Sequence, residues 1–227
     1  MFALFNENGP YQVNSDLSVV SREFAWSNEN HLLYIDSPVG TGYSFTKNDN
    51  GYARNQTAVA NDLFEALQQF FTLFNEYQQN DFYLTGESYA GKYVPALGYK
   101  IATEGSKAKM NLKGLVIGNG LIDPITQLDY ASLLYQIGFI DENEQDDLTS
   151  RQNVVQDLIE QKEYLKASWA LAPLVSGNGN EAPDTTWLYN VTNQENIYNF
   201  IETKEPNLGY YAKYITSAPI RQVCCQC

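Results

Sequence analysis

A serine set among small residues is the strongest candidate for chemistry in this sequence of 227 residues. Ser88 lies in the segment Gly86-Glu87-Ser88-Tyr89-Ala90, which fits the pattern G-x-S-x-G except that alanine takes the last position. A serine hydroxyl becomes a nucleophile when a general base removes its proton, and nearby N–H groups then stabilise the oxyanion. The segment therefore indicates acyl-transfer chemistry, with Ser88 as the nucleophile and the backbone N–H of Tyr89 as one oxyanion-hole donor.

The pattern alone does not identify a nucleophile, because it also fits a Gly-Ser turn that caps an ordinary helix. The elements on either side of Ser88 help to distinguish the two. Residues 82–85 form a short apolar run typical of a buried strand, and the residues from 90 to about 103 are helix-like, with Pro95 tolerated only near the start. A sharp turn from strand to helix needs small neighbours, and the helix N-terminus favours developing negative charge. The context favours the nucleophile and leaves the turn as the alternative.

Three predicted strands alternate with two predicted helices in the first half of the chain. The strands are residues 31–35, 82–85 and 112–117, and the helices are an amphipathic segment over 57–77 and the segment after Ser88. Parallel strands need crossover helices between them, so this order predicts an α/β fold with a parallel central sheet.

The sequence changes in character beyond the third predicted strand. Residues 131–172 carry a helical pattern, residues 176–180 are typical of a loop, and the acidic run 141–147 is expected to be a solvated helix start rather than a binding site. We therefore expect residues 1–124 to be the core domain, residues 125–222 to be a helical insertion or cap, and residues 223–227 to be a separate tail.

Composition excludes several classes of function. Lys and Arg number 14 against 27 Asp and Glu, a formal net charge of −13, so nucleic acid and anionic membrane surfaces would be repelled. Aromatic residues make up 14% of the chain, which is typical of a globular protein. No apolar stretch approaches the ~20 residues of a membrane span. We expect no nucleic-acid binding, no membrane insertion, no signal peptide within this chain and no cofactor.

The cysteines and the glycosylation sequons say little about the compartment. Cys224, Cys225 and Cys227 are clustered in the tail, and three thiols without a fourth ligand make a poor zinc site, so we predict no metal centre. Asn55 and Asn190 begin the tripeptides Asn-Gln-Thr and Asn-Val-Thr. Both are candidate N-glycosylation sites if the chain enters the secretory pathway.

The ten residues 86–95, Gly-Glu-Ser-Tyr-Ala-Gly-Lys-Tyr-Val-Pro, resemble the active-serine signature of the serine carboxypeptidases. Further matches follow in the family's order at 7–11, 26–44 and 117–124, and the resemblance runs to about residue 222. Within this family, the sequence of these segments is most similar to the vitellogenic-like carboxypeptidases. The resemblance implies an α/β-hydrolase fold with a helical cap, and an enzyme that removes residues one at a time from peptide C-termini at acidic pH.

The resemblance also implies roles for two glutamates. In the family, the glutamate before the serine, here Glu87, and the glutamate of the E-x-G-P segment, here Glu7, help to recognise the substrate's C-terminal carboxylate. Two carboxyl groups held close together cannot both ionise cheaply, so at acidic pH one keeps its proton and can donate a hydrogen bond. The alternative is that Glu7 has no binding role and is simply an exposed charge near an irregular chain terminus.

The sequence departs from the family in its catalytic base. In the family the catalytic Asp and His lie far downstream of the serine, whereas the one histidine here, His31, precedes Ser88 within a predicted strand and is expected to be structural. The family's Gly-Gly-Pro-Gly stretch lies before the residues that match Met1 onward. We therefore expect a truncated gene model, read-through or splice variant that is inactive alone and poorly soluble, because its sheet edge is uncovered.

Three functions stay open on the sequence. The first is a serine carboxypeptidase whose full-length parent is lysosomal, vacuolar or extracellular, acts on peptides with a free C-terminus, and can form a homodimer. The second is a catalytically dead relative that binds or stabilises a partner. The third is a carboxypeptidase-like acyltransferase that uses the same serine, and its choice of acceptor over water depends on water exclusion and acceptor pockets.

Overall fold

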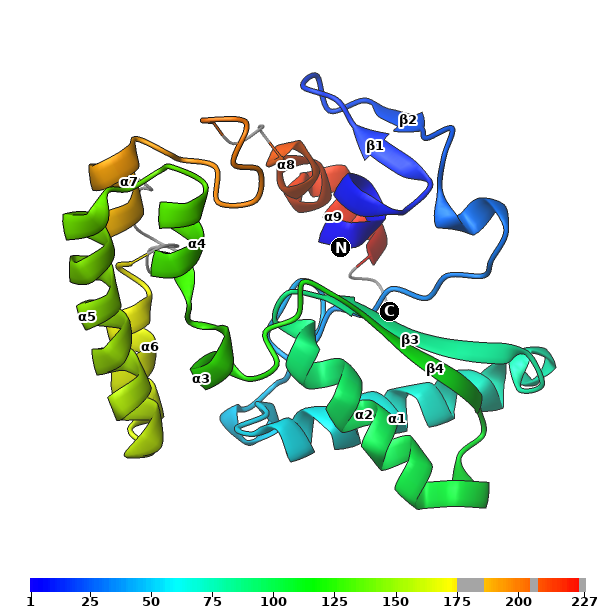
Figure 1. The fold of residues 1–227 in the computed structure, drawn as a ribbon. Helices are drawn as coiled ribbons and strands as arrows, with labels where there is room; N and C mark the ends of the chain where they lie inside the picture. The colour runs from blue at the N-terminus through cyan, green and yellow to red at the C-terminus, as the bar shows by residue number, and fades with distance from the viewer. Residues whose placement is uncertain (175–185, 205–207, 225–227) are drawn as a thin grey trace. The chain divides into compact units, whose positions relative to one another are not determined.

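The fold is taken from a computed structural model, which describes residues 1–174, 186–204 and 208–224 (Figure 1). The chain divides into two compact units, one of residues 1–122 with 207–227 and one of residues 123–206. Among the described residues, no helix combines the length and the hydropathy that a membrane span requires.

A pair of parallel strands lies at the centre of the first unit. Strand β3 (Asp81–Glu87) pairs with β4 (Asn111–Gly118), and the register places Leu84 beside Leu115 and Glu87 beside Gly118. Helix α1 (Gln56–Leu73) packs on α2 (Ala90–Glu104), and α2 packs on both strands (Figure 1). The order strand, crossover helix, parallel strand confirms the predicted α/β class.

The core of this unit explains why α1 and α2 form where they do. In α1, Asn55 caps the helix by accepting a hydrogen bond from the N–H of Ala58 at 2.9 Å. Apolar side chains at three- and four-residue spacing then bury one face of each helix in a single cluster with Leu84. The buried members from the two helices are Val59, Leu63, Phe64, Leu67, Phe71, Val94, Leu97 and Ile101. Both predicted helices are confirmed, although α1 ends at Leu73 and residues 75–77 form the 3₁₀ turn η4 (Asn75–Tyr77).

The predicted strand over residues 31–35 is wrong. These residues have no regular secondary structure, and although their side chains alternate between exposed and half-buried, they pair with no strand in the described part of the chain. Leu33 and Ile35 keep 46% and 39% of their surface exposed. A strand is completed by the ladder that a neighbour provides, and an apolar run alone supplies no such neighbour.

An antiparallel hairpin near the N-terminus was not predicted. It joins β1 (Tyr11–Val13) to β2 (Val19–Ser21), and it follows the short π-helix η1 (Ala3–Glu7). The turn is closed by Asp16, whose carboxylate accepts hydrogen bonds from the N–H and the hydroxyl of Ser18 at 2.9 and 2.6 Å. The strands are only three residues long, so their side-chain alternation carries little signal.

The remaining elements of the first unit are short. The 3₁₀ turns are η2 (Trp26–Asn28), η3 (Asp49–Gly51) and η5 (Gly105–Lys107), and the chain returns to this unit in α8 (Tyr210–Thr216) and α9 (Ala218–Cys224). Helix α8 packs on β1 and on η1, where the ring of Phe5 stacks on Tyr211 with centroids 6.4 Å apart. The predicted boundaries at residues 124 and 222 stay predictions.

The described elements of the second unit are helices, namely α3 (Pro124–Gln127), α4 (Tyr130–Gln136), α5 (Glu142–Glu160), α6 (Tyr164–Leu171) and α7 (Trp187–Thr192). The predicted helical pattern over 131–172 is thus confirmed as three helices. The acidic run opens α5: the Asp141 carboxylate accepts from the N–H of Glu144, and the Glu144 carboxylate accepts from the N–H of Asp141, both at 2.9 Å. The predicted loop at 176–180 and the end of the tail, 225–227, lie outside the described residues.

Candidate active site

Ser88 occupies a strained turn between a strand and a helix. It directly follows Glu87, the last residue of β3, and α2 begins two residues later at Ala90. The backbone of Ser88 is left-handed, with φ at 56°, and its side chain is exposed. A serine in this region costs about 1–3 kcal/mol, so the surrounding structure must impose it. This is the geometry that a nucleophile elbow requires.

Backbone hydrogen bonds hold the elbow against the end of β4. The N–H of Ser88 donates to the carbonyl oxygen of Gly118 at 3.1 Å. The carbonyl oxygen of Ser88 accepts from the N–H of Leu121 at 2.8 Å and from the N–H of Gly91 at 3.0 Å. Both ends of the Ser88 peptide are therefore fixed, and the strain is held in place by neighbouring backbone.

The small residues around Ser88 are required by close contacts. A Cβ added at Gly86 would lie 2.6 Å from the Cβ of Ala90 and 2.7 Å from a methyl group of Val94. A Cβ added at Gly91 would lie 2.8 Å from the backbone nitrogen of Leu121. Alanine is tolerated as the last residue of the motif because Gly86, on the other side of the contact, has no side chain.

The N–H of Tyr89, predicted from the sequence as an oxyanion-hole donor, lies at the start of α2. It donates to no other group in the part of the chain that the structure describes. Tyr89 is also the N-cap of α2, so this N–H belongs to the helix terminus where partial positive charge accumulates. The Tyr89 ring contacts Tyr93 at 5.3 Å between centroids, which holds the side chain to one side of the helix start.

Of the two predicted carboxylate-binding residues, Glu87 acts on the ionisation of Glu7. Glu7 is the last residue of η1, and Glu87 is the last residue of β3. Partial burial raises the pKa of Glu7 above its ordinary value, the negative charge of Glu87 raises it further, and the amine of Met1 acts in the opposite direction. Glu7 keeps an exposed side chain all the same. Two glutamates that are 80 residues apart in the sequence (87 − 7) thus lie close enough in the fold for the charge of Glu87 to act on Glu7.

His31 is not placed with these groups. Its ring makes an edge-to-face contact with Tyr77, with centroids 5.1 Å apart, which fits the structural role expected for it. No side chain among the described residues forms a hydrogen bond with the Ser88 hydroxyl. A general base for Ser88 is therefore not found within the described ranges.

The Asp36 loop is a feature whose role the sequence did not reveal. The Asp36 carboxylate accepts from the N–H of Tyr43 at 3.0 Å, and its carbonyl oxygen accepts from the hydroxyl of Ser44 at 2.6 Å. A Cβ added at Gly42 would lie 2.0 Å from the same carboxylate, so the loop closes only around glycine. The recurrence of glycine at 40 and 42 was the available signal.

The candidate glycosylation residues are both exposed. Asn55 uses its side-chain oxygen as the N-cap of α1, and Asn190 lies within α7. No cluster of His, Cys, Asp and Glu side chains suited to a metal ion occurs among the described residues.

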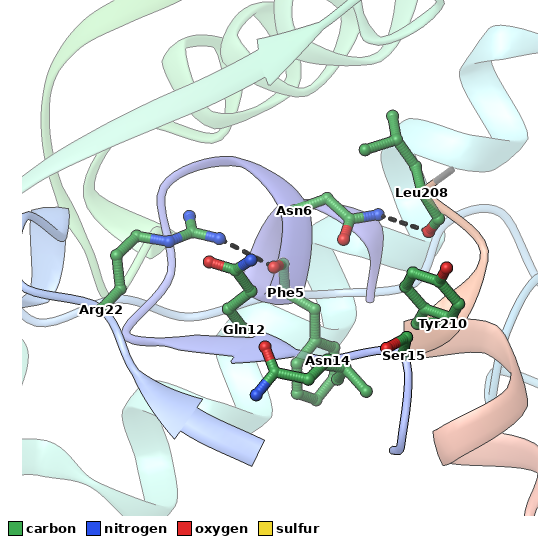
Figure 2. A pocket seen from close by; sticks show the side chains of 9 residues that line it. Phe5, Asn6, Gln12, Asn14, Ser15, Arg22, Leu208 and Tyr210 are labelled. Atoms are coloured by element: carbon green, nitrogen blue, oxygen red, sulfur yellow. Dashed lines mark hydrogen bonds between the residues drawn. The ribbon is translucent and has the colours of Figure 1, made fainter. Parts of the chain in front are cut away.

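An open cavity of about 430 Å³ lies beside the hairpin (Figure 2). Its lining includes neither Ser88 nor either glutamate, and consists of Phe5, Asn6, Gln12, Val13, Asn14, Ser15, Arg22, Leu208 and Tyr210. We assign it no function.

Comparison with known proteins gives a consistent result. The profile of a family described as serine carboxypeptidase matches residues 1–226. The venom serine carboxypeptidase of Apis mellifera is 44% identical over 227 residues, covering 98% of this chain and 48% of that protein. The probable serine carboxypeptidase CPVL of Mus musculus is 44% identical over 98% of this chain and 47% of its own length. The vitellogenic carboxypeptidase of Aedes aegypti is 40% identical over 90% of this chain and 43% of its own length.

A solved structure also resembles this chain. It is that of Kex1(delta)p, a prohormone-processing carboxypeptidase from Saccharomyces cerevisiae, with a TM-score of 0.71 and 27% sequence identity. The match covers 98% of this chain and 52% of that one. The chain spans about half the length of the curated relatives it matches.

Proposed function

This chain belongs to the serine carboxypeptidase family, which has the α/β-hydrolase fold, and on that premise we propose that Ser88 is the nucleophile of a carboxypeptidase. The enzyme would release C-terminal amino acids from peptides through an acyl-enzyme intermediate at acidic pH. The observation that carries the proposal is the left-handed backbone of Ser88 between β3 and α2, inside a segment that reads as the family's serine signature. An ordinary helix cap has no need of this strain.

In the proposed reaction, the Ser88 oxygen attacks the scissile carbonyl carbon, and the N–H of Tyr89 donates a hydrogen bond to the oxyanion. The C–N bond then breaks, the C-terminal amino acid leaves with a proton, and water later hydrolyses the serine ester. The family resemblance assigns the proton transfer to a histidine that an aspartate orients. We propose that both groups lie in a part of the full-length protein that corresponds to the half of the relatives not covered by this chain. His31, the one histidine here, contacts Tyr77 instead.

Substrate selection is proposed to rest on Glu7 and Glu87. The pKa of Glu7 is raised first by partial burial and then by Glu87, so Glu7 keeps its proton to a higher pH than an isolated glutamate. A protonated carboxyl group can donate a hydrogen bond to the free C-terminal carboxylate of a peptide. This contact weakens as the pH rises through the raised pKa, so the substrate is bound best in acid.

The family relationship also suggests the compartment, the glycosylation and the oligomeric state of the full-length protein. We place it in the secretory pathway, in a lysosome, a vacuole or outside the cell, with glycans on Asn55 and Asn190 and assembly as a homodimer. The family relationship supports peptide substrates, and the net charge of −13 argues against nucleic acid as a partner.

The experiment compares peptides that differ only in a free or an amidated C-terminus, using the full-length natural protein that carries this sequence. Release of the C-terminal amino acid at mildly acidic pH, abolished by Ser88→Ala and strongly reduced by amidation, is the expected result. Release that survives Ser88→Ala would refute the assignment. A folded protein with no release at all would favour the relative that acts by binding, and transfer of the acyl group to an added alcohol in preference to water would favour the acyltransferase.

A further inference from the structure

Glu7 is the last residue of η1, and in the turn that follows it the last carbonyl groups of this helix lack their usual partners. In η1 the N–H groups of Asn8 and Gly9 both donate to the carbonyl oxygen of Ala3, each at 3.2 Å. The next residue, Pro10, has no N–H to donate. The later carbonyl groups of the helix, including those of Phe5 and Glu7, must therefore find other donors.

Arg22 supplies these donors. Its guanidinium donates one hydrogen bond to the carbonyl oxygen of Phe5 at 2.8 Å and a second to the carbonyl oxygen of Glu7. Figure 2 shows the guanidinium reaching Phe5. The backbone N–H of the same residue donates to the carbonyl oxygen of Pro10 at 2.8 Å. Arg22 thus binds the chain on both sides of the turn and at Glu7 itself.

The charge of Arg22 is directed at backbone rather than at an acidic side chain. Arg22 is half-buried, and it forms no ion pair with the acidic residues of the described chain. The planar guanidinium presents several N–H groups in a fixed fork, so two carbonyl oxygens can be held at once. A cation at the carbonyl end of a helix is also favoured by the helix dipole.

Two further contacts hold the same turn through Asn8. The hydroxyl of Tyr34 donates to the side-chain oxygen of Asn8 at 2.8 Å, and the N–H of Trp26 donates to its carbonyl oxygen at 3.0 Å. None of these contacts uses the carboxyl group of Glu7. The backbone around Glu7 is fixed while its carboxyl group stays available to Glu87.

We propose that Arg22 is a positioning residue for Glu7, fixing the backbone that carries the Glu7 carboxyl group and so setting the acid-dependent recognition of the substrate carboxylate. The inference rests on the proposed function for its consequence in catalysis. The positioning itself rests on the hydrogen bonds of Arg22 alone.

The charged and titratable groups around Glu7 determine in which direction its pKa changes when Arg22 is removed. They are Glu87 on β3, the amine of Met1, the hydroxyl of Tyr34, and Arg22 itself. Removing a positive charge near a carboxyl group raises the pKa of that group. Releasing the turn instead removes the partial burial of Glu7 and the effect of Glu87, which lowers its pKa. A downward shift after loss of Arg22 therefore reports positioning and not charge.

The test is a ¹³C NMR titration of the glutamate carboxyl groups in the full-length natural protein that carries this sequence, with Glu7→Gln used to assign the resonance of Glu7. In Arg22→Ala, the pKa of Glu7 should fall toward the ordinary value of 4.5, and Arg22→Lys should give an intermediate value because lysine lacks the fork. Arg54→Ala is the matched control, since Arg54 is an exposed arginine of the same unit and should leave Glu7 unchanged.

A second comparison uses Glu87→Gln. In the wild-type background this change should lower the pKa of Glu7, and in Arg22→Ala it should have no further effect, because the charge of Glu87 no longer acts on Glu7. An unchanged or raised pKa of Glu7 in Arg22→Ala, or a Glu87 effect that survives there, would overturn the proposal. If Arg22→Ala does not fold, the shift in Arg22→Lys decides in the same way.

The catalytic consequence is read separately in the full-length protein. Arg22→Ala should raise KM for peptides with a free C-terminus by roughly tenfold, the worth of one charge-assisted hydrogen bond, with kcat nearly unchanged. A protein without peptidase activity would refute the proposed function and leave the titration to decide the role of Arg22. If the protein is active and Arg22→Ala has the same KM as the wild type, the catalytic part of the inference is overturned.

Discussion

At the scale of single residues, the backbone of Ser88 makes a prediction that does not depend on activity. Glycine adopts a left-handed φ without steric cost, whereas alanine carries the same strain as serine. Ser88→Gly should therefore be more stable than Ser88→Ala by about 1 kcal/mol, although both remove the nucleophile. Chemical denaturation of the two variants measures the difference. A glycine variant less stable than the alanine variant would mean that the turn is not strained.

Glu7 should make the stability of the protein depend on pH in a defined direction. Its pKa in the folded state lies above the ordinary 4.5, mainly through partial burial and secondly through Glu87. The folded state then holds the proton more tightly than the unfolded chain, so the contribution of Glu7 to stability falls as pH rises through this window. The free energy of unfolding of Glu7→Gln, relative to wild type, should be higher at pH 7 than at pH 4. Urea titrations at the two pH values test this, and a difference independent of pH would contradict it.

Residue patterns predicted the serine but not its supporting contacts. The segment around Ser88 could be recognised because small residues are forced at fixed spacing by the close approach of Gly86, Ala90 and Gly91 to their neighbours. Arg22 acts through hydrogen bonds to backbone carbonyl groups, which leave no trace in the identity of the residues that accept them. Its role therefore becomes visible only in the folded structure.

At the scale of elements, Gly91 links helix α2 to the segment after β4. Alanine is the better helix former, but its Cβ at this position would lie 2.8 Å from the backbone nitrogen of Leu121, which cannot move aside. Gly91→Ala should destabilise the protein by about 1–3 kcal/mol. Gly98→Ala is the matched control in the same helix, because its Cβ would meet only the flexible end of Leu115 and should cost less. Equal effects of the two substitutions on the midpoint of thermal unfolding would contradict the packing described.

Helix α1 combines a cap and a candidate glycosylation site in one residue. The cap uses the side-chain oxygen of Asn55, whereas a glycan would be attached to its nitrogen, so the two are compatible. Expression through a secretory pathway should give a glycan at Asn55 that Asn55→Asp and Thr57→Ala both remove. Asn55→Asp retains a capping oxygen, so it should be about 1 kcal/mol more stable than Asn55→Ala. Peptide mass mapping with denaturation measures both effects, and an unmodified Asn55 would refute the glycosylation site.

Elements with a long periodic pattern were predicted well, and short or unpaired ones were not. Helices α1 and α2 and strands β3 and β4 follow from apolar spacing that the core requires. Residues 31–35 also form a mostly apolar run, but a strand needs a partner strand to hydrogen-bond with. That partner comes from elsewhere in the sequence, so a local pattern does not predict it. The hairpin β1–β2 is too short for its alternation to be distinguished from chance.

At the scale of the whole molecule, apolar surface and charge act in opposite directions. On β3 and β4, Tyr83 and Val116 keep 54% and 48% of their surface exposed, which favours association. The net charge of −13 opposes it. Poor solubility of the isolated chain stays a prediction. The family relationship could be predicted from the sequence because the matching segments occur in the family's order.

The most direct test of the account is labelling of the full-length natural protein with a serine-reactive phosphonate probe, followed by intact mass and peptide mapping. The probe reacts only with a serine that is activated as a nucleophile. We expect a single adduct on Ser88, formed faster than on any other serine and absent from Ser88→Ala. A folded protein that releases C-terminal amino acids yet carries the adduct on another serine, or no adduct at all, would contradict it.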